Sequence, residues 1–509
     1  MARIIFRTIE ELTNWSNNLD AEINFVPTMG NLHKGHEKLI ETANNQKNGY
    51  TLVSIFVNPL QFDCKEDLKN YPKTTDDDQS IAFQSGADAI FIPKAKDLFP
   101  ANYLQYHTIK ASVELNSTLC GLNRVGHFDG VCTVVYRLLK LVNPKYLFLG
   151  EKDWQQLLIV RNMIKEMKLD IKIKSISTLR DHDGVPLSSR NSLLKKSERA
   201  KLIFFSKKLK EAKEIFEKGK SLDLNKLIKQ IELKDIKIEY LKVVDAFSLK
   251  EKITSDKISM LAGAIKCGHT RLIDHVFLMK NKPIIAIDGP AGSGKSTVTK
   301  LIARKLKLLY LDTGAMYRAV SWYLIKNDIN YSSKDDLSKG LKNISIIFQS
   351  DTDDNQSVLV NNIDVTKAIR AQEINSLVSK IASIDEVRAF LLNEQRKLGK
   401  KGGLVAEGRD IGTTVFPYAA LKIYLTASIN ERAKRRKLEL EQNGYDNLDF
   451  SIIREQIEQR DHNDMNRINS PLKKAKDAIS IESDGLSVEE IVEKIVDIYN
   501  DKIPKDIQN

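Results

Sequence analysis

The sequence predicts an α/β protein that contains parallel sheets and more than one folding unit. Short apolar runs rich in β-branched residues alternate with amphipathic stretches, and this alternation is typical of doubly wound sheets. The chain has 509 residues, which at roughly 100–200 residues per domain predicts about three folding units. Its hydrophobic fraction of 42% is sufficient for packed cores and excludes a disordered chain.

The first part of the chain supplies the alternation. Residues 21–30, 50–59 and 87–93 have the composition of buried strands. Residues 36–46 and 75–86 follow the first and second of these strands with a helical pattern. The order strand, helix, strand predicts a parallel sheet with helices on its faces.

The composition changes near residues 195–235, where Lys and Glu dominate. Apolar residues at helical spacing over 201–231 predict a pair of amphipathic helices in a smaller subdomain. Strand-like segments at 236–247 and 258–268 complete that unit. A new apolar strand then begins at Pro283, so we expect a domain boundary near residue 280.

The net charge of +12 and the pI of about 9.1 raise the possibility of nucleic-acid binding. The chain has neither an arginine-rich tract nor a recognition-helix or RNA-binding motif. Positive charge equally suits small anions such as nucleotides and carboxylates. We therefore expect small-molecule substrates and no nucleic-acid partner.

Cysteine usage and hydropathy predict the compartment. Cys64, Cys120, Cys132 and Cys267 form no CxxC pair and no metal-ligand spacing, which favours reduced thiols. The N-terminus has no apolar signal core, and no stretch reaches the ~18 apolar residues that would span a bilayer. These features predict a soluble, cytoplasmic protein without membrane contact.

The first chemical pattern follows the strand at 21–30. Gly30 and Gly35 allow close backbone approach at a turn that opens a helix, and a helix N-terminus suits a phosphate. His33 and His36, three residues apart, would share one face of that helix and donate to phosphate oxygens. By themselves these histidines are also compatible with a metal pair or with two surface residues.

Five segments in order make the pattern more specific. They are PTMGNLHKGH at 27–36, SIFVNPLQF at 54–62, NRVGHFDGV at 123–131, FLGEKDWQQL at 148–157 and DGVPLSSRN at 183–191. Over residues 1–279 the chain resembles pantothenate synthetases, which belong to the HxGH nucleotidyltransferases. The resemblance implies that pantoate attacks the α-phosphorus of ATP to give pantoyl adenylate, and that β-alanine then displaces AMP.

The resemblance also implies site residues. His33, His36, Lys152 and Arg190 would be catalytic, and Asp153 would lie near Mg²⁺. The ATP-binding set would be Met29, Gly30, Asn31, Leu32, His33, Lys34, Gly35, His36, Gly150, Glu151, Lys152, Asp153, Leu179, Leu187, Ser188, Ser189 and Arg190. Pantoate and β-alanine would contact Asn58, Gln61 and Gln155, although ordinary loop polarity also explains such amides. His275 occupies a position where related chains usually carry Asn.

The second chemical pattern is GxxxxGKS, placed between a strand and a helix, as a phosphate-binding P-loop requires. Backbone N–H groups of such a loop surround phosphates, Lys295 would reach the β- and γ-phosphates, and Ser296 would place its hydroxyl on Mg²⁺. The ATP-binding residues would be Gly289, Pro290, Ala291, Gly292, Ser293, Gly294, Lys295, Ser296 and Thr297.

The motifs LDTGAMYRAV at 311–320, EGRDIGTTVFP at 407–417, ERAKRRKLE at 431–439 and REQIEQRDHNDMNRINSPL at 454–472 follow in order. Over about 283–500 this arrangement resembles bacterial-type cytidylate kinases. The resemblance implies catalytic roles for Lys295 and Arg409 and an ATP lid carrying Arg435 and Arg436. Alternatively, the basic residues around Arg435 and Arg436 would simply form a solvent-exposed helix face. CMP would contact Thr313, Tyr317, Arg318, Ser379, Arg388, Arg409, Asp410, Arg460, Asp464 and Arg467.

The two resemblances imply a Rossmann-like nucleotidyltransferase domain at 1–175 and a small α+β subdomain at 176–279. A P-loop nucleoside monophosphate kinase with an acceptor insert and a lid would occupy 280–509. ATP would be the substrate of both reactions with Mg²⁺, and dCMP or UMP could compete with CMP as acceptor. We expect a homodimer through the first domain. There are two alternatives to a bifunctional enzyme. The first is one active enzyme joined to an inactive scaffold domain, and the second is a nucleic-acid-binding protein that is switched by nucleotides.

Overall fold

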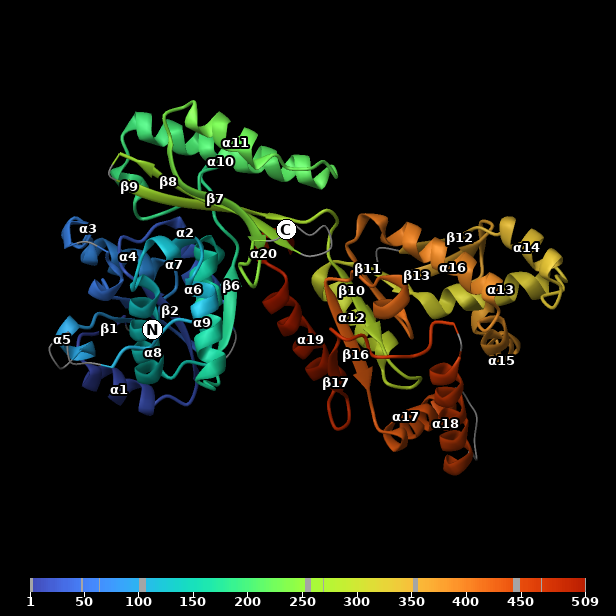
Figure 1. Ribbon diagram of the computed structural model, residues 1–509. Helices are drawn as coiled ribbons and strands as arrows, with labels where there is room; N and C mark the ends of the chain where they lie inside the picture. Colours follow the sequence, from blue (N-terminus) through green and yellow to red (C-terminus); the bar gives the residue numbers. More distant parts are fainter. Residues whose placement is uncertain are drawn as a thin grey trace. The chain divides into compact units, whose positions relative to one another are not determined.

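The computed structural model describes residues 3–46, 49–63, 65–99, 107–251, 258–268, 270–350, 356–442, 449–467 and 469–508. The chain divides into two compact units, and Figure 1 shows the elements of each. The first unit comprises residues 1–280 together with 504–509, and the second comprises residues 281–503. The kinase was expected to extend over residues 280–509, whereas the described residues 504–508 group with the first unit.

The first unit contains a six-stranded parallel sheet in the order β1-β4-β3-β2-β5-β6. Its strands are β1 (Ile4–Phe6), β2 (Glu22–Thr28), β3 (Gly49–Ile55), β4 (Ala89–Phe91), β5 (Tyr146–Gly150) and β6 (Lys172–Ile176). The accompanying helices are α1 (Ile9–Asn17), α2 (Lys34–Asn44), α3 (Lys65–Lys69), α4 (Thr75–Gln84), α5 (Ala95–Leu98), α6 (Val113–Asn116), α7 (Leu119–Asn123), α8 (His127–Val142) and α9 (Trp154–Glu166). The parallel α/β prediction is confirmed.

Strand order fixes where a ligand can bind. Strands β3 and β4 are added on one side of β2, and β5 and β6 on the other. The order therefore reverses between β2 and β5, and ligands of open α/β sheets bind beyond the carboxyl ends of strands at such a switch point. The loop carrying His33 and His36 leaves β2, and the loop carrying Lys152 leaves β5.

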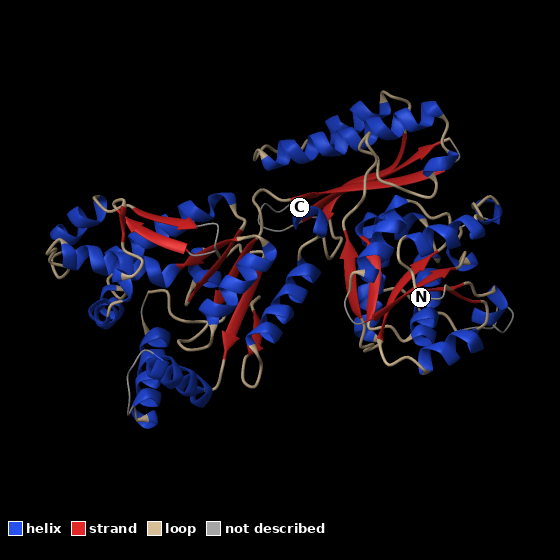
Figure 2. Cartoon of the chain, turned by 180° about the vertical axis from the view of Figure 1, so that it is seen from behind, coloured by secondary structure: helices blue, strands red, loops and turns tan. Residues whose placement is uncertain are grey.

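A second layer of the first unit is a three-stranded antiparallel sheet of β7 (Lys237–Asp245), β8 (Ser259–Cys267) and β9 (Thr270–Leu278). The predicted amphipathic pair is present as α10 (Lys196–Glu217) and α11 (Leu224–Glu232), and Figure 2 shows both along one face of this sheet. Phe205 of α10 is fully buried there. Gly263 of β8 makes room for it, because a Cβ at that position would lie 2.6 Å from the Phe205 ring.

The second unit has a five-stranded parallel sheet in the order β11-β15-β10-β16-β17. Its strands are β10 (Ile284–Asp288), β11 (Leu309–Asp312), β15 (Leu404–Gly408), β16 (Leu421–Thr426) and β17 (Ile479–Glu482). Its helices are α12 (Lys295–Leu306), α13 (Thr313–Lys326), α14 (Lys334–Lys342), α15 (Gln372–Ile381), α16 (Asp385–Leu398), α17 (Ile429–Gln442), α18 (Phe450–Asn466) and α19 (Val488–Lys502).

A separate antiparallel sheet of three short strands lies between α14 and α15 in the sequence. They are β12 (Ile346–Ser350), β13 (Gln356–Val360) and β14 (Ile363–Asp364). Val358 and Val360 join the core that α13 and α16 build on the parallel sheet. The Asp-rich stretch 351–355, whose composition suggests a turn, lies outside the described residues.

Candidate functional sites

The loop after β2 is held by one buried carboxylate. Asp78 of α4 is 1% exposed, and its two oxygens accept the backbone N–H groups of Asn31 at 3.0 Å and Leu32 at 2.7 Å. Gly30 has a φ of +81°, and a Cβ there would lie 2.9 Å from the Asp78 carboxylate. The glycine is thus required both by its backbone conformation and by the close carboxylate.

His33 and His36 form a close pair at the start of α2, with ring centroids 4.1 Å apart and ring planes tilted by 41°. The Gly35 N–H donates to His33 Nδ1 at 3.1 Å, and the His33 N–H donates to His36 Nδ1 at 3.3 Å. Burial, reinforced by Lys152, lowers the pKa of His33 to about 4. Burial, reinforced by His33, lowers the pKa of His36 to about 3. Both rings are therefore neutral near pH 7 and, with Nδ1 accepting, each carries its proton on Nε2.

Gly35 is explained by its contact with His33. A Cβ at residue 35 would lie 2.8 Å from His33 Cε1 and 3.0 Å from Nδ1. Any side chain would displace the ring that caps α2. The glycine between the two histidines therefore maintains the orientation of the pair.

The DGVPLSSRN segment closes over this loop. Ser189 Oγ donates to the Asn31 carbonyl at 3.1 Å, and Asn31 Nδ2 donates to the Ser189 carbonyl at 2.8 Å. Leu187 donates its N–H to the Leu179 carbonyl at 2.9 Å, which joins two of the predicted ATP segments. Arg190 is paired with Asp67 at 3.1 Å. The structure therefore brings the predicted loops after β2 and β6 together.

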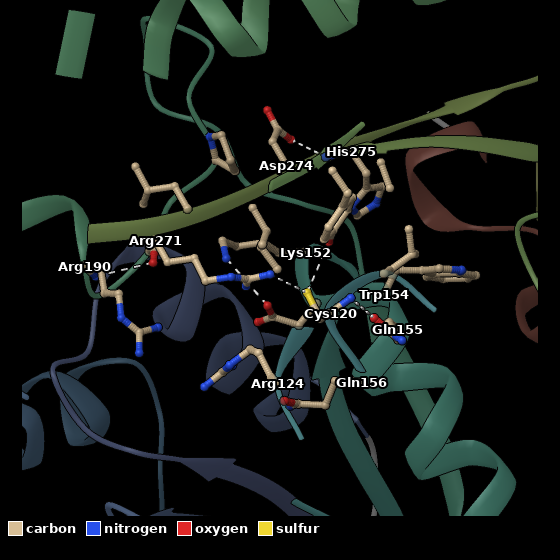
Figure 3. Close-up of a pocket in the computed structure, with 18 of the residues that line it drawn as sticks. Cys120, Arg124, Lys152, Trp154, Gln155, Gln156, Arg190, Arg271, Asp274 and His275 are labelled. Carbon is tan, nitrogen blue, oxygen red and sulfur yellow. Dashed lines mark hydrogen bonds and ion pairs between the residues drawn. The ribbon is translucent and has the colours of Figure 1, made fainter. Parts of the chain in front are cut away.

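A pocket lies against these loops, and its walls come from both layers of the first unit (Figure 3). Predicted residues in the wall are Lys152, Asp153, Gln155, Ser188 and Arg190. Polar residues that sequence reasoning did not select also line it: Cys120, Arg124, His127, Gln156, Tyr240, Arg271, Asp274 and His275. Arg124 and His127 belong to the recognised NRVGHFDGV motif. Tyr240 and Arg271 come from antiparallel strands, for which no motif gave a signal.

Arg124 and His127 hold the predicted substrate loop. His127 Nδ1 donates to the Gln61 carbonyl at 2.7 Å, and Arg124 Nη2 donates to the same oxygen at 3.0 Å. Burial and the neighbouring Arg124 lower the pKa of His127 to about 4, so the ring is neutral and its Nε2 accepts from Arg124 Nη1 at 3.0 Å. The Gln61 side chain lies near the first loop, with Nε2 2.7 Å from Met29 Sδ.

Three predicted ligands have other partners. Gln155 Nε2 donates to the carbonyls of Leu115 and Thr118, both at 2.8 Å, and its Oε1 accepts the Cys120 N–H at 3.0 Å. Both of its N–H bonds are used to hold α6 and α7. Asn58 is 1% exposed and is bonded to Gln61, Gly130 and Leu60.

Glu151 is the third of these predicted ligands. It is fully buried, and its carboxylate accepts from Ser175 Oγ and from the backbone N–H groups of Lys505 and Asp506. The carboxylate is therefore committed to the protein interior. Only the backbone of residue 151 remains for a nucleotide.

In the second unit the P-loop connects β10 to α12. Gly289 has a φ of +155°, and a Cβ there would lie 2.0 Å from the Leu425 carbonyl, so no other residue fits. Lys295 is 6% exposed, and Nζ donates to the Pro290 carbonyl at 2.6 Å and to Ser293 Oγ at 3.3 Å. Burial, reinforced by Arg409, lowers the pKa of Lys295 well below its usual value. The ammonium thus lies folded on the loop that it would use to bind phosphate.

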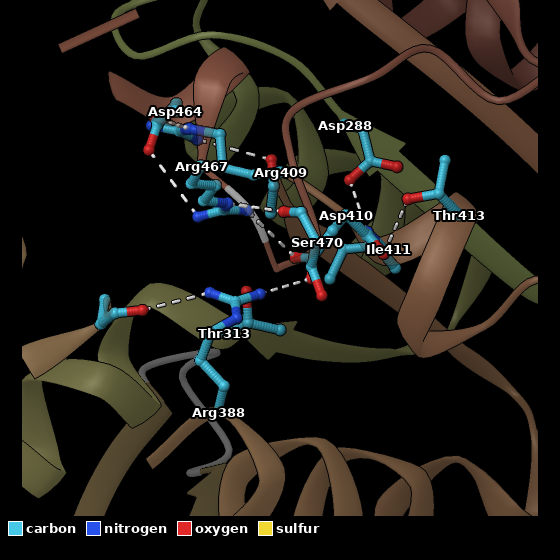
Figure 4. Close-up of polar contacts among 12 residues, drawn as sticks. Asp288, Thr313, Arg388, Arg409, Asp410, Ile411, Thr413, Asp464, Arg467 and Ser470 are labelled. Carbon is cyan, nitrogen blue, oxygen red and sulfur yellow. Dashed lines mark hydrogen bonds and ion pairs between the residues drawn. The ribbon is translucent and has the colours of Figure 1, made fainter. Parts of the chain in front are cut away.

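A second buried carboxylate joins the P-loop strand to the acceptor motif. Asp288 accepts the N–H groups of Ile411 and Gly412, both at 2.7 Å (Figure 4). Burial raises the pKa of Asp288 to about 6 although these hydrogen bonds oppose the shift. Ser296 Oγ donates to Glu407 at 2.9 Å, and Thr313 Oγ1 donates to the Glu407 carbonyl at 2.6 Å.

Three of the predicted acceptor arginines, Arg388, Arg409 and Arg467, gather in one network, drawn in Figure 4. Arg388 pairs with Asp410 at 2.7 Å, and Arg409 pairs with Asp464 at 2.9 Å. Arg467 lies 3.9 Å from Asp410 and 3.8 Å from Asp464. The clustering predicted from widely spaced motifs is therefore present. Tyr317 lies under Arg388, whose guanidinium carbon is 5.7 Å from the ring centroid.

Other predicted kinase residues lie apart from this network. Ser379 is exposed on α15, and Arg436 is half-exposed and pairs with Glu439 at 2.8 Å. Arg318 pairs with Asp312 at 3.1 Å. Arg435 donates to Ser483 Oγ at 3.0 Å, and its Nη1 lies 3.6 Å from where a Cβ on Gly294 would be.

Arg432 was missed by sequence reasoning, although it stands in the recognised lid motif. It is 5% exposed, donates to the Ala291 carbonyl of the P-loop at 3.1 Å and pairs with Asp461 at 2.6 Å. Arg432, which donates to the P-loop, thus lies three residues before Arg435, the first of the two predicted lid arginines. The lid motif was recognised, but its repeated basic residues hid which one faces inward.

Comparisons with known proteins agree with this division. A family model described as pantoate-β-alanine ligase matches residues 4–277, and one described as cytidylate kinase matches residues 285–501. A bifunctional pantoate ligase/cytidylate kinase of Prochlorococcus marinus subsp. pastoris is 62% identical over 508 residues, covering 100% of both chains. One from P. marinus strain NATL1A is 49% identical over 510 residues, covering 100% of this chain and 99% of the relative.

Solved structures similar to the first unit include pantothenate synthetase from Thermus thermophilus. It is 32% identical, with a TM-score of 0.49, and covers 54% of this chain and 98% of its own. The Francisella tularensis pantoate-β-alanine ligase, complexed with β-γ ATP and β-alanine, is 32% identical with a TM-score of 0.48 and coverage of 54% and 97%. Full-length identity to curated relatives, together with a separate family match in each unit, shows that this chain belongs to the family of bifunctional pantoate ligases/cytidylate kinases.

Proposed function

We propose that the first unit condenses pantoate with β-alanine and that the second unit phosphorylates CMP and dCMP, each with ATP. The observation that supports this best is that each unit gathers candidate phosphate-binding side chains at the carboxyl edge of its parallel sheet. The first set contains two neutral imidazoles with Nε2–H donors, and the second contains the P-loop lysine and the arginine network.

In the ligase reaction a pantoate carboxylate oxygen attacks the α-phosphorus of ATP, and the bond to the β,γ-pyrophosphate breaks. The β-alanine amine then attacks the acyl carbon, AMP leaves, and the amine loses a proton. His33 and His36 donate hydrogen bonds to phosphate oxygens as negative charge develops. Lys152 and Arg190 offset phosphate charge, Lys152 as a point charge and Arg190 as a planar fork.

The pantoate site includes the amide of Gln61 and, we propose, Gln156 in place of Gln155. Gln155 and Gln156 both belong to the first turn of α9, and both line the pocket (Figure 3). Both N–H bonds of Gln155 are already donated to backbone carbonyls. An amide that offers donors and an acceptor suits a hydroxy acid.

We expect Gln156→Ala to raise the pantoate KM by about tenfold, because an enzyme–substrate hydrogen bond of roughly 1–1.5 kcal/mol is lost. Gln155→Ala should instead lower the melting temperature of the first unit, since α6 and α7 lose three hydrogen bonds. Steady-state ligase kinetics and thermal unfolding of the two variants distinguish these roles. A Gln155→Ala protein with wild-type stability and a tenfold higher pantoate KM would restore the original assignment.

In the kinase reaction an oxygen of the CMP phosphate attacks the γ-phosphorus of ATP, and ADP leaves. Arginines offset the repulsion between two anionic substrates and hold the phosphoryl group in line. Arg318, Arg388, Arg409 and Arg467 supply this charge. Their carboxylate partners keep the guanidinium groups in place, and phosphate oxygens then take over some of these contacts.

The residues present fit Mg²⁺ in both units. Ser296 Oγ and the Glu407 carboxylate are bonded to each other at the start of α12, and Mg²⁺ favours oxygen ligands shared with nucleotide phosphates. Asp153 is the corresponding oxygen donor in the first unit, 3.6 Å from Lys152 Nζ. Among the described residues no group of three or more His, Cys, Asp or Glu side chains could hold a metal alone. A bound ion would neutralise phosphate charge in both reactions.

We further propose a homodimer through the first domain and a cytoplasmic location. Cys120, Cys132 and Cys267 are free and buried, which favours a reducing compartment. Across the described residues, no helix is both long and apolar enough to cross a membrane. Sedimentation of the full chain tests the dimer.

Parallel assays on the full-length chain test the function. One supplies ATP, Mg²⁺, pantoate and β-alanine and measures AMP and pantothenate; the other supplies ATP, Mg²⁺ and CMP and measures ADP and CDP. We expect both activities, with CMP and dCMP outcompeting UMP at equal concentration. Activity in one assay alone would favour an inactive scaffold half. DNA or RNA binding that persists at moderate salt would instead revive the nucleic-acid hypothesis.

A further inference from the structure

The segment after α19 contributes to the first unit. It contains the buried Pro504 and a short helix, α20 (Lys505–Gln508), labelled at the red end of the chain in Figure 1. The N–H of Lys505 donates to Glu151 Oε1 at 2.8 Å, and that of Asp506 donates to Glu151 Oε2 at 3.2 Å. Both donors thus belong to a segment more than 350 positions away from Glu151 in the sequence.

Glu151 lies within the FLGEKD motif, between Gly150 and Lys152. It is 0% exposed, and its other hydrogen bond comes from Ser175 Oγ of β6 at 2.8 Å. A buried carboxylate without donors is costly, because its desolvation is not offset. The two N–H groups of residues 505 and 506 therefore allow this carboxylate to remain inside and hold the motif against β6.

The same segment reaches a second part of the nucleotide site. Asp506 Oδ1 accepts the Thr178 N–H at 2.9 Å. The next residue, Leu179, accepts the Leu187 N–H at 2.9 Å, at the start of the loop that contains Ser188 to Arg190. The negative charge of Asp506 also acts on His275, which lines the pocket together with Lys152.

We propose that residues 504–508 are positioning residues for the adenylate-forming site. They fix two backbone segments, 150–153 and 178–179, from which the ATP-contacting loops extend. The inference rests on the proposed ligase function. Ligase activity would then depend on residues 504–508, which follow the kinase in the sequence. The residues assigned to the kinase site all precede this segment.

Three variants of the protein test the proposal: a shortened chain and two substitutions at Asp506. A chain ended after Ile503 should show an ATP KM of the ligase raised by about tenfold to a hundredfold, as displacement of binding groups by about 1 Å produces. Asp506→Ala should raise the same KM by about three- to tenfold, the effect of one lost hydrogen bond. Asp506→Asn retains an oxygen acceptor for Thr178 and should lie near wild type. CMP kinase kinetics should stay within about twofold throughout, since the hydrogen bonds to Glu151 and Thr178 that these variants remove lie within the first unit.

Asp20→Asn, an exposed carboxylate before β2, is the matched control and should change neither activity. An unchanged ATP KM in both the shortened chain and Asp506→Ala would overturn the proposal. Asp506→Asn as impaired as Asp506→Ala would also overturn it, because the acceptor would then be irrelevant. The proposal would also be rejected if the shortened chain lost both activities in proportion while the Asp506→Ala variant kept wild-type activity. That result would indicate general unfolding of the shortened chain. Absence of ligase activity in the unmodified chain would instead reject the proposed function.

Discussion

Replacing Lys295 with Ala is expected to lower CMP kinase activity by about 10²–10³-fold or more, the cost of removing one preorganised donor to a developing anion. In the structure Nζ already lies on the P-loop, donating to the Pro290 carbonyl and Ser293 Oγ. Nucleotide phosphates would replace these weak partners with charged oxygens. Alanine supplies no cation, and the three glycines of the loop cannot compensate for it. Lys295→Arg should also be poor, because a planar fork does not fit a site built for a point charge.

The ligase provides the control within the same polypeptide. Pantothenate formation by Lys295→Ala should remain within about twofold of wild type, since Lys295 belongs to the second unit and the ligase site is built from residues of the first. Lys339→Ala, an exposed lysine on α14, should leave both activities unchanged. Coupled assays of ADP and AMP release measure the two reactions separately. A Lys295→Ala chain that loses pantothenate formation as well would show that the two units are coupled through their active sites.

The loops of both sites could be predicted because their signals are local. Gly289 and Gly30 are required by positive φ and by atoms that lie within 3 Å of where a Cβ would be, so the loop itself dictates these residues. His33 and His36 follow a recognisable strand and open a helix. The alternation of strand-like and helix-like stretches likewise predicted the parallel sheets, and apolar residues at helical spacing predicted the pair α10 and α11. These features depend on neighbours in sequence, which a motif records.

Other features depended on partners distant in sequence. Gln155 and Gln156 are adjacent and chemically identical, and only the backbone carbonyls of residues 115 and 118 decide which amide is already satisfied. Glu151 reads as part of an ATP motif, yet its carboxylate is used by residues 505 and 506. No propensity or periodicity reports such pairings, since they are fixed only when the sheet and its loops are assembled.

The kinase shows the same limit. Asp288 reads as the last residue of a strand, but in the structure it fixes the N–H groups of Ile411 and Gly412. Arg432 and Arg436 lie on one helix, and only the first faces the P-loop, at 5% exposure against 48% for the Arg436 side chain. A run of basic residues at helical spacing does not show which side of the helix is inward. Sequence therefore predicted the network of arginines better than the lid.

The second large effect is expected at His36. His36→Ala should lower pantothenate formation by about 10²–10³-fold through loss of an N–H donor to the reacting phosphate. The His33 N–H would also lose the Nδ1 acceptor that holds it at the start of α2. CMP phosphorylation reports whether the chain remains folded and should be unchanged. Single-turnover formation of pantoyl adenylate separates this step from amide formation, and we expect the adenylation rate to carry the loss.

His36→Gln distinguishes hydrogen-bond donation from proton transfer. The Gln side chain keeps an N–H donor near the position of Nε2 but cannot exchange a proton, so partial activity indicates donation and full loss indicates transfer. The pKa of His36 is lowered to about 3 and that of His33 to about 4, so both rings are neutral well below neutral pH. The ligase pH profile should therefore show no histidine step between pH 5.5 and 8. Because these pKa values are depressed, the rings favour the folded state fully above the unfolded value of about 6.5, and this stability declines as pH falls toward about 4. A step in adenylation rate near pH 6.5 that disappears in His36→Gln would show that His36 titrates during the reaction and would contradict the neutral-donor role.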